Sequence, residues 1–158
     1  MLRPHIVILG AGFGGVYVAK KLTAAVKAGE IDVTIVNRTN SFLFTPLLHE
    51  VATGGLNPRT VAEPLREIFV RTNIRIVEGI IESIDMENRN ILVKTELHTV
   101  TLKYDYLIVA TGAETNYYGI AGAAEHALPL KTLRDAAIIR NRVIDAMEQA
   151  VLTEDSEE

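Results

Sequence analysis

The stretch His5-Ile6-Val7-Ile8-Leu9-Gly10-Ala11-Gly12-Phe13-Gly14-Gly15 decides the fold of this chain. It begins with a short run of branched apolar residues, which is typical of a strand buried on both faces of a parallel sheet. Glycines 10, 12 and 15 then give the spacing Gly-x-Gly-x-x-Gly, and an alanine-rich helical pattern follows. A strand, a tight glycine turn and a helix N-terminus together can bind the pyrophosphate of a dinucleotide. We therefore predict a nucleotide-binding turn, and the alternative is a glycine turn that only closes a strand–helix unit.

The residues after this turn complete a strand–helix–strand unit. Apolar residues spaced by four predict a helix over residues 14–28, and Gly29 is placed to end it. Residues 32–36 form the next apolar run and are expected to be the second strand. Two parallel strands joined in this way require a crossover connection, which is right-handed in nearly all known cases.

The rest of the chain predicts an α/β fold with an antiparallel insertion. Residues 61–70 have helical spacing, and residues 74–77 and 106–110 are expected to be further parallel strands. Three short strands joined by tight turns are expected at 80–84, 91–95 and 100–102. Such a β-meander is informative, since plain NAD-dehydrogenase domains usually carry a helix there. Together these elements predict a Rossmann-like, doubly wound parallel sheet with an inserted antiparallel β-meander.

A long helix is expected near the end of the chain, over residues 133–152, with Thr132 as its N-terminal cap. One apolar stripe of this helix is expected to face the core, and Met147 is expected to fill core space rather than bind a cofactor. The members of the stripe are Leu133, Ala136, Ala137, Arg140, Val143, Ile144, Met147 and Val151.

The end of the second strand departs from the usual dinucleotide pattern. An acid about 20 residues after the glycines normally binds the ribose hydroxyls, but this chain has Asn37 there. An asparagine accepts hydrogen bonds without a charge, so a weaker ribose contact is expected. Arg38 follows, and it could recognise a 2′-phosphate, lie along an adenine or be a solvated loop charge.

Residues 39–57 form an apolar segment with no clean period, interrupted by Pro46, Gly54 and Gly55. An apolar loop of this kind is expected to fold over something. In a flavin or nicotinamide protein the candidate is the ring system, and the alternative is a loop that caps the core.

Composition excludes several classes of function. The chain has no cysteine, which excludes disulfides, cysteine-ligated metals and cysteine nucleophiles. Its four histidines have no metal-binding spacing, so no metal site is predicted. Of the 20 acidic residues four lie in the segment 154–158, and the rest balance the 16 basic residues, which leaves no basic field for nucleic acid. No apolar run reaches the roughly 18 residues needed to cross a bilayer, so a cytoplasmic location is expected.

Three motifs together resemble the N-terminal part of a type II NADH:quinone oxidoreductase, a member of the two-dinucleotide-binding flavoprotein superfamily. They are GAGFGG at Gly10–Gly15, FTPLLHEVATGGL at Phe44–Leu56 and YDYLIVATGAETNYYGI at Tyr104–Ile120. The first and third are shared widely across the superfamily, whereas Phe-x-Pro-Leu-Leu at 44–48 is similar to the type II pattern. The absence of cysteine also disfavours a disulfide reductase.

The resemblance implies FAD as the cofactor and gives each matched residue a role. The turn would bind the pyrophosphate, Asn37 would stand at the ribose, Arg38 would flank the adenine, and Ile81 would meet the adenine through its backbone. Thr45, Pro46 and Leu47 would lie against the isoalloxazine, while Ala110, Thr111 and Gly112 would border the phosphate and ribityl region. The turn residues are Gly10, Ala11, Gly12, Phe13, Gly14 and Gly15. No catalytic side chain is assigned, because the flavin carries the chemistry.

The implied reaction passes a hydride from NADH to FAD and electrons on to a quinone. On this interpretation residues 1–152 are an incomplete FAD-binding domain, and residues 153–158 are an acidic tail or a linker toward an NADH-binding domain. The fragment alone is expected to be inactive. The full-length protein is expected to lie on the cytoplasmic face of the membrane through its C-terminal part, and a homodimer is allowed. The alternatives are a flavoprotein reductase with a ferredoxin- or sulfide-linked acceptor, and a non-catalytic dinucleotide-binding domain.

Overall fold

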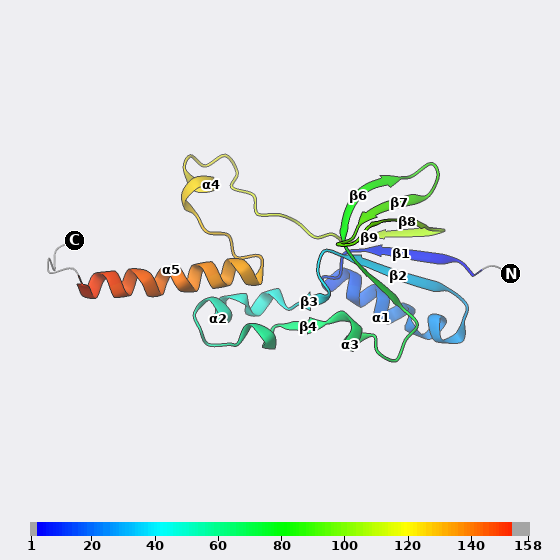
Figure 1. Cartoon of the computed structure of the whole chain (residues 1–158), viewed down its shortest axis with the longest axis horizontal. Helices are drawn as coiled ribbons and strands as arrows, with labels where there is room; N and C mark the ends of the chain where they lie inside the picture. The colour runs from blue at the N-terminus through cyan, green and yellow to red at the C-terminus, as the bar shows by residue number, and fades with distance from the viewer. Residues whose placement is uncertain (1–2, 153–158) are drawn as a thin grey trace. The chain divides into compact units, whose positions relative to one another are not determined.

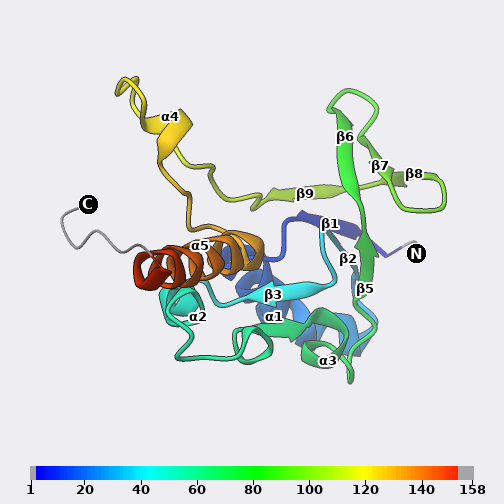
Figure 2. The ribbon, with the colours of Figure 1, turned by 60° about the vertical axis from the view of Figure 1, so that its left-hand side comes forward.

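The computed structural model of the chain describes residues 3–152. Its contacts divide the chain into two compact units, each made of two segments (Figures 1 and 2). Among the described residues, unit 1 comprises 3–42 and 63–112, and unit 2 comprises 43–62 and 113–152. The acidic segment 153–158 lies outside the described residues, so its predicted role as a tail or linker has no structural counterpart here.

Unit 1 is built on a parallel sheet with the strand order β5-β2-β1-β9. The strands are β1 (His5–Leu9), β2 (Asp32–Asn37), β5 (Arg75–Glu78) and β9 (Tyr106–Val109). Ile8 of β1 lies opposite Ile35 of β2 and Ile108 of β9. All three pairings are parallel, so the carboxyl ends of the strands meet at one edge of the sheet. The four parallel strands expected from the sequence are confirmed.

Helix α1 (Phe13–Ala28) covers one face of this sheet. Val16, Ala19 and Val26 of α1 share a buried cluster with Ile8 and Ile35, whose side chains are fully buried. Complete burial of an isoleucine side chain contributes roughly 1.5–3 kcal/mol. The helix ends at Gly29, which adopts the left-handed conformation predicted for a C-terminal stop.

The β-meander covers the other face. It consists of the antiparallel strands β6 (Ile80–Asp85), β7 (Asn90–Lys94) and β8 (Thr99–Lys103). Because successive side chains of a strand point to opposite faces, Val7 and Leu9 of β1 point to the face opposite helix α1. They pack instead with Ile91 and Val93 of the meander. The predicted α/β fold is thus confirmed, and the meander takes the place of a second helical layer.

Among the described residues, β9 is an edge strand of the parallel sheet. Its sequence is Tyr-Leu-Ile-Val, and Tyr106 and Val109 are 63% and 62% exposed. One row of β9 backbone groups pairs with β1, and no described strand pairs with the other row.

Unit 2 is formed around two helices, α2 (Leu48–Ala52) and α5 (Leu133–Leu152). Leu48 and Val51 of α2 pack with Val61 and with Ala136 at the start of α5. The unit also contains the 3-10 turns η1 (Thr45–Leu47) and η2 (Pro58–Thr60) and the short helix α4 (Ala123–His126). The chain passes between the units through β3 (Ser41–Leu43) and β4 (Ala62–Pro64), which pair as a two-stranded sheet.

Two expectations about the middle of the chain were wrong. The helix predicted over residues 61–70 is a strand, β4, followed by the four-residue helix α3 (Leu65–Ile68). Pro64 disfavours helical geometry at Glu63, so the helix begins after the proline instead of containing it. The irregular loop expected at 39–57 contains β3, η1 and α2, whose lengths of three to five residues are too short to show a period.

The predicted helix α5 and its cap are confirmed, but its buried stripe is wrong for most of its length. Ala136 is buried, whereas Val143, Met147 and Val151 are 53%, 67% and 85% exposed. The described residues of unit 2 reach only the first turns of the helix, so Met147 is not a core filler in this chain.

No helix within residues 3–152 is long and apolar enough to cross a membrane. The assignment of residues 1–152 as one FAD-binding domain stays a prediction, because the two compact units describe packing and not the ligand that each unit binds.

Candidate functional site

The glycine turn lies at the carboxyl edge of the unit 1 sheet, between β1 and α1. Gly10 has a φ angle of 98°, and a Cβ atom there would collide with the carbonyl oxygen of Ala110. A Cβ atom on Gly15 would collide with the carbonyl oxygen of Gly10. Gly10 and Gly15 therefore allow β9 and α1 to approach the turn closely, as the spacing predicts.

Gly12 has a different environment. It is the N-terminal cap residue of α1, and a Cβ atom on it would meet no other atom within 4 Å. The first N–H groups of a helix have no partner within the helix, and the helix dipole adds partial positive charge there. The first turn of α1 contains no acidic residue. The open space beside Gly12 thus adjoins a surface suited to an anionic group such as a phosphate.

Two amides of the turn already have partners within the protein. The N–H of Gly10 donates to the carbonyl oxygen of Val36 at 2.7 Å. The N–H of Ala11 donates to Oδ1 of Asn37 at 3.0 Å. The amides that begin α1, from Gly12 to Gly15, are consequently the better candidates for a phosphate.

Asn37, the residue at the predicted ribose position, is the last residue of β2 and is half-buried. Besides accepting from Ala11, it donates from Nδ2 to the carbonyl oxygen and to the hydroxyl of Thr39, at 2.9 and 3.3 Å. Its own carbonyl oxygen accepts from the N–H of Gly79 at 2.9 Å. Arg38, the predicted adenine neighbour, is exposed beside it.

The third motif ends beside the glycine turn. Ala110 follows β9, donates its N–H to the carbonyl oxygen of Leu9 at 2.7 Å and closely approaches Gly10. Thr111 and Gly112 are exposed, and Gly112 has a φ angle of 79° with no atom near the position of a Cβ. The structure therefore brings the first and third motifs to the same edge, as predicted for parallel strands.

Ile81, the predicted backbone neighbour of an adenine, lies on β6 two residues after Gly79. The register of the β6–β7 pair shifts between Ile81 and Ser83, so the pairing is irregular at this point. Its side chain is half-buried against the cluster beneath the meander.

The segment predicted to lie against a flavin ring forms the turn η1 of unit 2. Thr45 and Pro46 are exposed, whereas Leu47 is half-buried against the apolar cluster of α2 and α5. Pro46 occupies one of the first positions of η1, where a proline is well tolerated. His49 and Glu50 follow in α2, and Nε2 of His49 lies 3.5 Å from Oε1 of Glu50.

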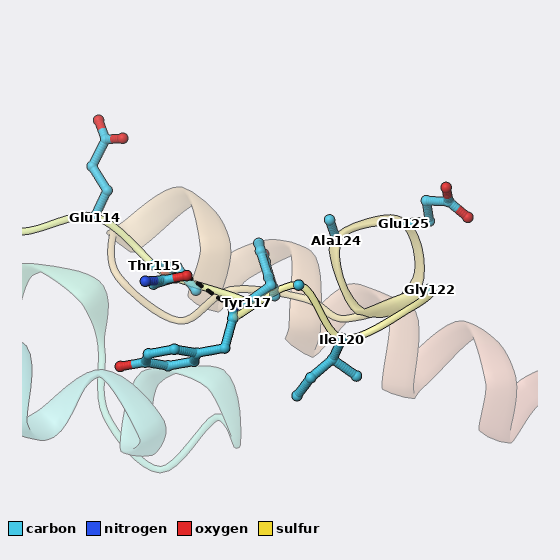
Figure 3. Close-up of a pocket in the computed structure, with 10 residues that line it drawn as sticks. Glu114, Thr115, Tyr117, Ile120, Gly122, Ala124 and Glu125 are labelled. Carbon is cyan, nitrogen blue, oxygen red and sulfur yellow. Dashed lines mark hydrogen bonds between the residues drawn. The ribbon is translucent and has the colours of Figure 1, made fainter.

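A hollow of about 540 Å³ in unit 2 is lined by ten residues of the segment 114–125 (Figure 3). The carboxyl groups of Glu114 and Glu125 lie at opposite ends of this loop, and both point away from Tyr117. Oδ1 of Asn116 accepts a hydrogen bond from the N–H of Tyr118 at 2.8 Å. The charged groups do not converge on one point, so the glycine turn of unit 1 is the stronger candidate site.

Sequence reasoning missed two residues of this site, Thr39 and Gly79, which both contact Asn37. Gly79 carried a signal, since a lone glycine between two strands indicates a bulge or a close backbone approach. A Cβ atom on Gly79 would come within 2.7 Å of the carbonyl oxygen of Lys94. Thr39 gave no such signal.

The parallel sheet, the glycine turn at its carboxyl edge and the open position at Gly12 define an α/β dinucleotide-binding protein. Comparison with protein families narrows the class, since the model for pyridine nucleotide-disulphide oxidoreductases matches residues 4–152. The chain belongs to the pyridine nucleotide-disulphide oxidoreductase family.

Curated relatives are of the kind that the sequence motifs resemble, which confirms that resemblance. The type II NADH:quinone oxidoreductase Ndh of Mycobacterium tuberculosis is 37% identical over 156 residues, covering 98% of this chain and 33% of that protein. A probable NADH dehydrogenase of Dictyostelium discoideum is 36% identical, covering 97% of this chain and 34% of that protein. The chain thus spans about a third of the length of these relatives.

Solved structures agree. The structure of NDH2 from Plasmodium falciparum in complex with NADH has a TM-score of 0.82 and 30% identity, covering 98% of this chain and 32% of that one. The sulfide:quinone oxidoreductase of Aquifex aeolicus has a TM-score of 0.79 over 92% of this chain and 32% of that one, at 24% identity. The latter similarity supports the fold alone.

Proposed function

We propose that this chain binds FAD as part of a flavoprotein oxidoreductase that passes a hydride from NADH to FAD and electrons on to a quinone. One observation carries the proposal: in a chain of this family, the glycine turn leaves open space at Gly12 beside the N-terminus of α1. A cofactor with a pyrophosphate fits such a position. The relatives named as NADH:quinone oxidoreductases supply the reaction.

Within this proposal the residues of unit 1 bind and orient the nucleotide half of FAD. The amides from Gly12 to Gly15 would hold the pyrophosphate, and the backbone of Thr111 and Gly112 would border it. Arg38 would lie along the adenine and Ile81 would meet it through its backbone. Gly10 and Ala11, whose N–H groups are already bonded, would shape the turn.

Thr45, Pro46 and Leu47 keep the role that the resemblance implies, beside the isoalloxazine. FAD, when bound, supplies the ring that accepts a hydride and passes electrons on. The exposed Thr45 and Pro46 offer a surface without a charged group, which suits a flat aromatic ring. No side chain of the chain is proposed as a catalytic acid, base or nucleophile.

The remaining partners are proposed for the whole protein. They are NADH, a quinone, a membrane contact on the cytoplasmic face and a second copy in a homodimer. The names of the relatives support NADH and quinone, and the Saccharomyces cerevisiae relative is named as an external mitochondrial enzyme.

Reconstitution with FAD tests the proposal. The purified chain is incubated with excess FAD, the unbound cofactor is removed on a desalting column, and the visible spectrum is recorded. We expect the bands of an oxidised flavin to elute with the protein. A folded chain that stays colourless, and whose unfolding temperature FAD does not change, would contradict FAD binding and favour a domain for another nucleotide.

A further inference from the structure

Asn37 has a role that its place at the ribose position does not suggest. It ends β2 at the carboxyl edge of the sheet, where the turn after β1, the loop after β2 and the junction after β5 all meet. Each of these three connections receives a hydrogen bond from Asn37 or gives one to it, through Ala11, Thr39 and Gly79.

The bond to Ala11 continues the pairing of β1 with β2 beyond the point where the backbone pairing stops. The last backbone bond between β2 and the turn after β1 runs from the N–H of Gly10 to the carbonyl oxygen of Val36. The next amide, that of Ala11, turns to a side chain, Oδ1 of Asn37, at 3.0 Å. One more residue of the turn is therefore fixed to β2, and helix α1 begins two residues later, at Phe13.

The bonds to Thr39 explain why an amide fits here better than a carboxylate. Nδ2 of Asn37 donates to the carbonyl oxygen of Thr39 at 2.9 Å and to its hydroxyl at 3.3 Å. An aspartate at this position could still accept from Ala11, but its second oxygen would face a carbonyl oxygen with no proton between them. Nδ2 of Asn37 thus donates to two atoms of Thr39, while Oδ1 accepts from Ala11.

We propose that Asn37 is a positioning residue for the phosphate-binding turn, and that it holds Ala11 on β2 so that the amides from Gly12 to Gly15 face the pyrophosphate. This inference rests on the proposed nucleotide function of the turn. It assigns the grip on the ligand to the phosphates and makes the ribose hydroxyls minor contributors at this residue.

A binding cycle separates positioning from direct ribose contact. The affinities of ADP and 2′-deoxy-ADP are measured by calorimetry for the natural chain and for Asn37→Ala. We expect the substitution to weaken both nucleotides by the same factor, about five- to tenfold, the usual size for a lost hydrogen bond. A loss on removing the 2′-hydroxyl that is present in the natural chain and absent in Asn37→Ala would overturn the inference, because it would make Asn37 a ribose ligand.

Asn37→Asp and Asn40→Ala complete the series. Asn37→Asp retains an acceptor for Ala11, so we expect it to recover part of the affinity that Asn37→Ala loses. Asn40 is the matched control, because it is an exposed asparagine of the same loop and no side-chain hydrogen bond is recorded for it in the described residues. Equal losses in Asn40→Ala and Asn37→Ala would contradict a specific role for Asn37.

Hydrogen exchange tests the same contact without any nucleotide. We expect the Ala11 amide to exchange at least tenfold faster in Asn37→Ala, while the Gly10 amide, bonded to Val36, keeps its protection. Unchanged exchange at Ala11 would overturn the positioning role. If the natural chain bound no ADP, the proposed function would fail, whereas the exchange result would still decide whether Asn37 holds the turn.

Discussion

The three glycines of the turn have distinct roles, although their spacing in the sequence treats them as one motif. Gly15 faces the carbonyl oxygen of Gly10, whereas Gly12 faces open space. The first contact concerns packing within the protein, and the second concerns what can approach from outside.

Substitution by alanine should therefore separate folding from binding. We expect Gly12→Ala to leave the free energy of unfolding nearly unchanged, because its φ of −76° suits alanine and its Cβ meets no atom within 4 Å. The added methyl group should instead weaken FAD at least about tenfold, or about 1.4 kcal/mol, by occupying the phosphate position.

Gly15→Ala serves as the paired variant. Its Cβ would collide with backbone, so we expect it to lose roughly 1–3 kcal/mol of stability, the usual cost of overpacking. Chemical denaturation measures stability, and flavin fluorescence measures binding. If Gly12→Ala bound FAD as tightly as the natural chain, the phosphate would have to lie elsewhere.

The residue scale also shows where sequence reasoning reached its limit. The identity of Asn37 marked it as a weak ribose ligand, but its contacts with Ala11 and Gly79 depend on connections that are distant from it in sequence. No spacing rule relates Ala11 and Gly79 to Asn37, so these two contacts could be seen only in three dimensions.

Among the elements, α5 begins with a capping arrangement that the sequence partly revealed. The N–H of Asp135 donates to the hydroxyl of Thr132 at 3.2 Å, which confirms the predicted cap. Oδ2 of Asp135 accepts in return from the N–H groups of Lys131 and Thr132, at 3.0 and 2.8 Å. This reciprocal pattern resembles a capping box.

The cap should make the stability of α5 depend on pH. Partial burial acts to raise the pKa of Asp135, but hydrogen bonds from Lys131 and Thr132 outweigh it and hold the pKa below its ordinary value of 3.8. A pKa lowered by folding stabilises the folded state above the unfolded value, and the stabilisation is lost as pH falls through the folded value.

We therefore expect Asp135→Asn to cost roughly 0.5–1 kcal/mol at pH 7, in the lower range for a lost cap, and to approach the natural chain as pH falls below 3.8. Helix content during thermal unfolding, followed by circular dichroism, measures the difference. Asp145→Asn removes the same charge from an exposed position of the same helix and is the control. A difference that did not shrink in acid would exclude the carboxylate as the stabilising group.

The accuracy of the predicted elements followed their length and their surroundings. The strands β1, β2, β5 and β9 were predicted from short apolar runs that are continuous in sequence. The central strands β1 and β2 are largely buried, as such runs suggest, whereas β5 and β9 at the edges of the sheet are more exposed. The helix over 61–70 was wrong because Pro64 interrupts it, and its apolar spacing instead serves β4 and α3. The stripe of α5 was wrong because amphipathic spacing shows which side of a helix is apolar, not what covers it.

For the molecule as a whole, FAD should act as a stabilising ligand. A ligand that binds only the folded state at about 100 times its Kd adds about 2.7 kcal/mol to the free energy of unfolding. We expect the unfolding temperature to rise with FAD concentration in the natural chain. The Gly12→Ala variant should show a much smaller rise at the same concentrations, and an equal rise in both proteins would place FAD away from the turn.

The chain should bind FAD without oxidising NADH. Its sequence contains one Gly-x-Gly-x-x-Gly turn, which the proposal assigns to FAD, and no second turn of this spacing for NADH. The rate of NADH oxidation is followed by the loss of NADH absorbance, with the reconstituted chain and a soluble quinone analogue present. We expect this rate to equal the rate measured without protein. Robust turnover would show that these residues also contain a hydride-donor site.

The exposed edge of β9 has a practical consequence for the behaviour of the protein in solution. A strand with one unpaired row of N–H and C=O groups is a template for another strand. The sequence Tyr-Leu-Ile-Val has high β propensity and contains neither a charge nor a proline to discourage such pairing. We therefore expect chains to aggregate at high concentration by pairing along β9. Val109 is exposed, so Val109→Lys would place a charge on this strand and should reduce the aggregation.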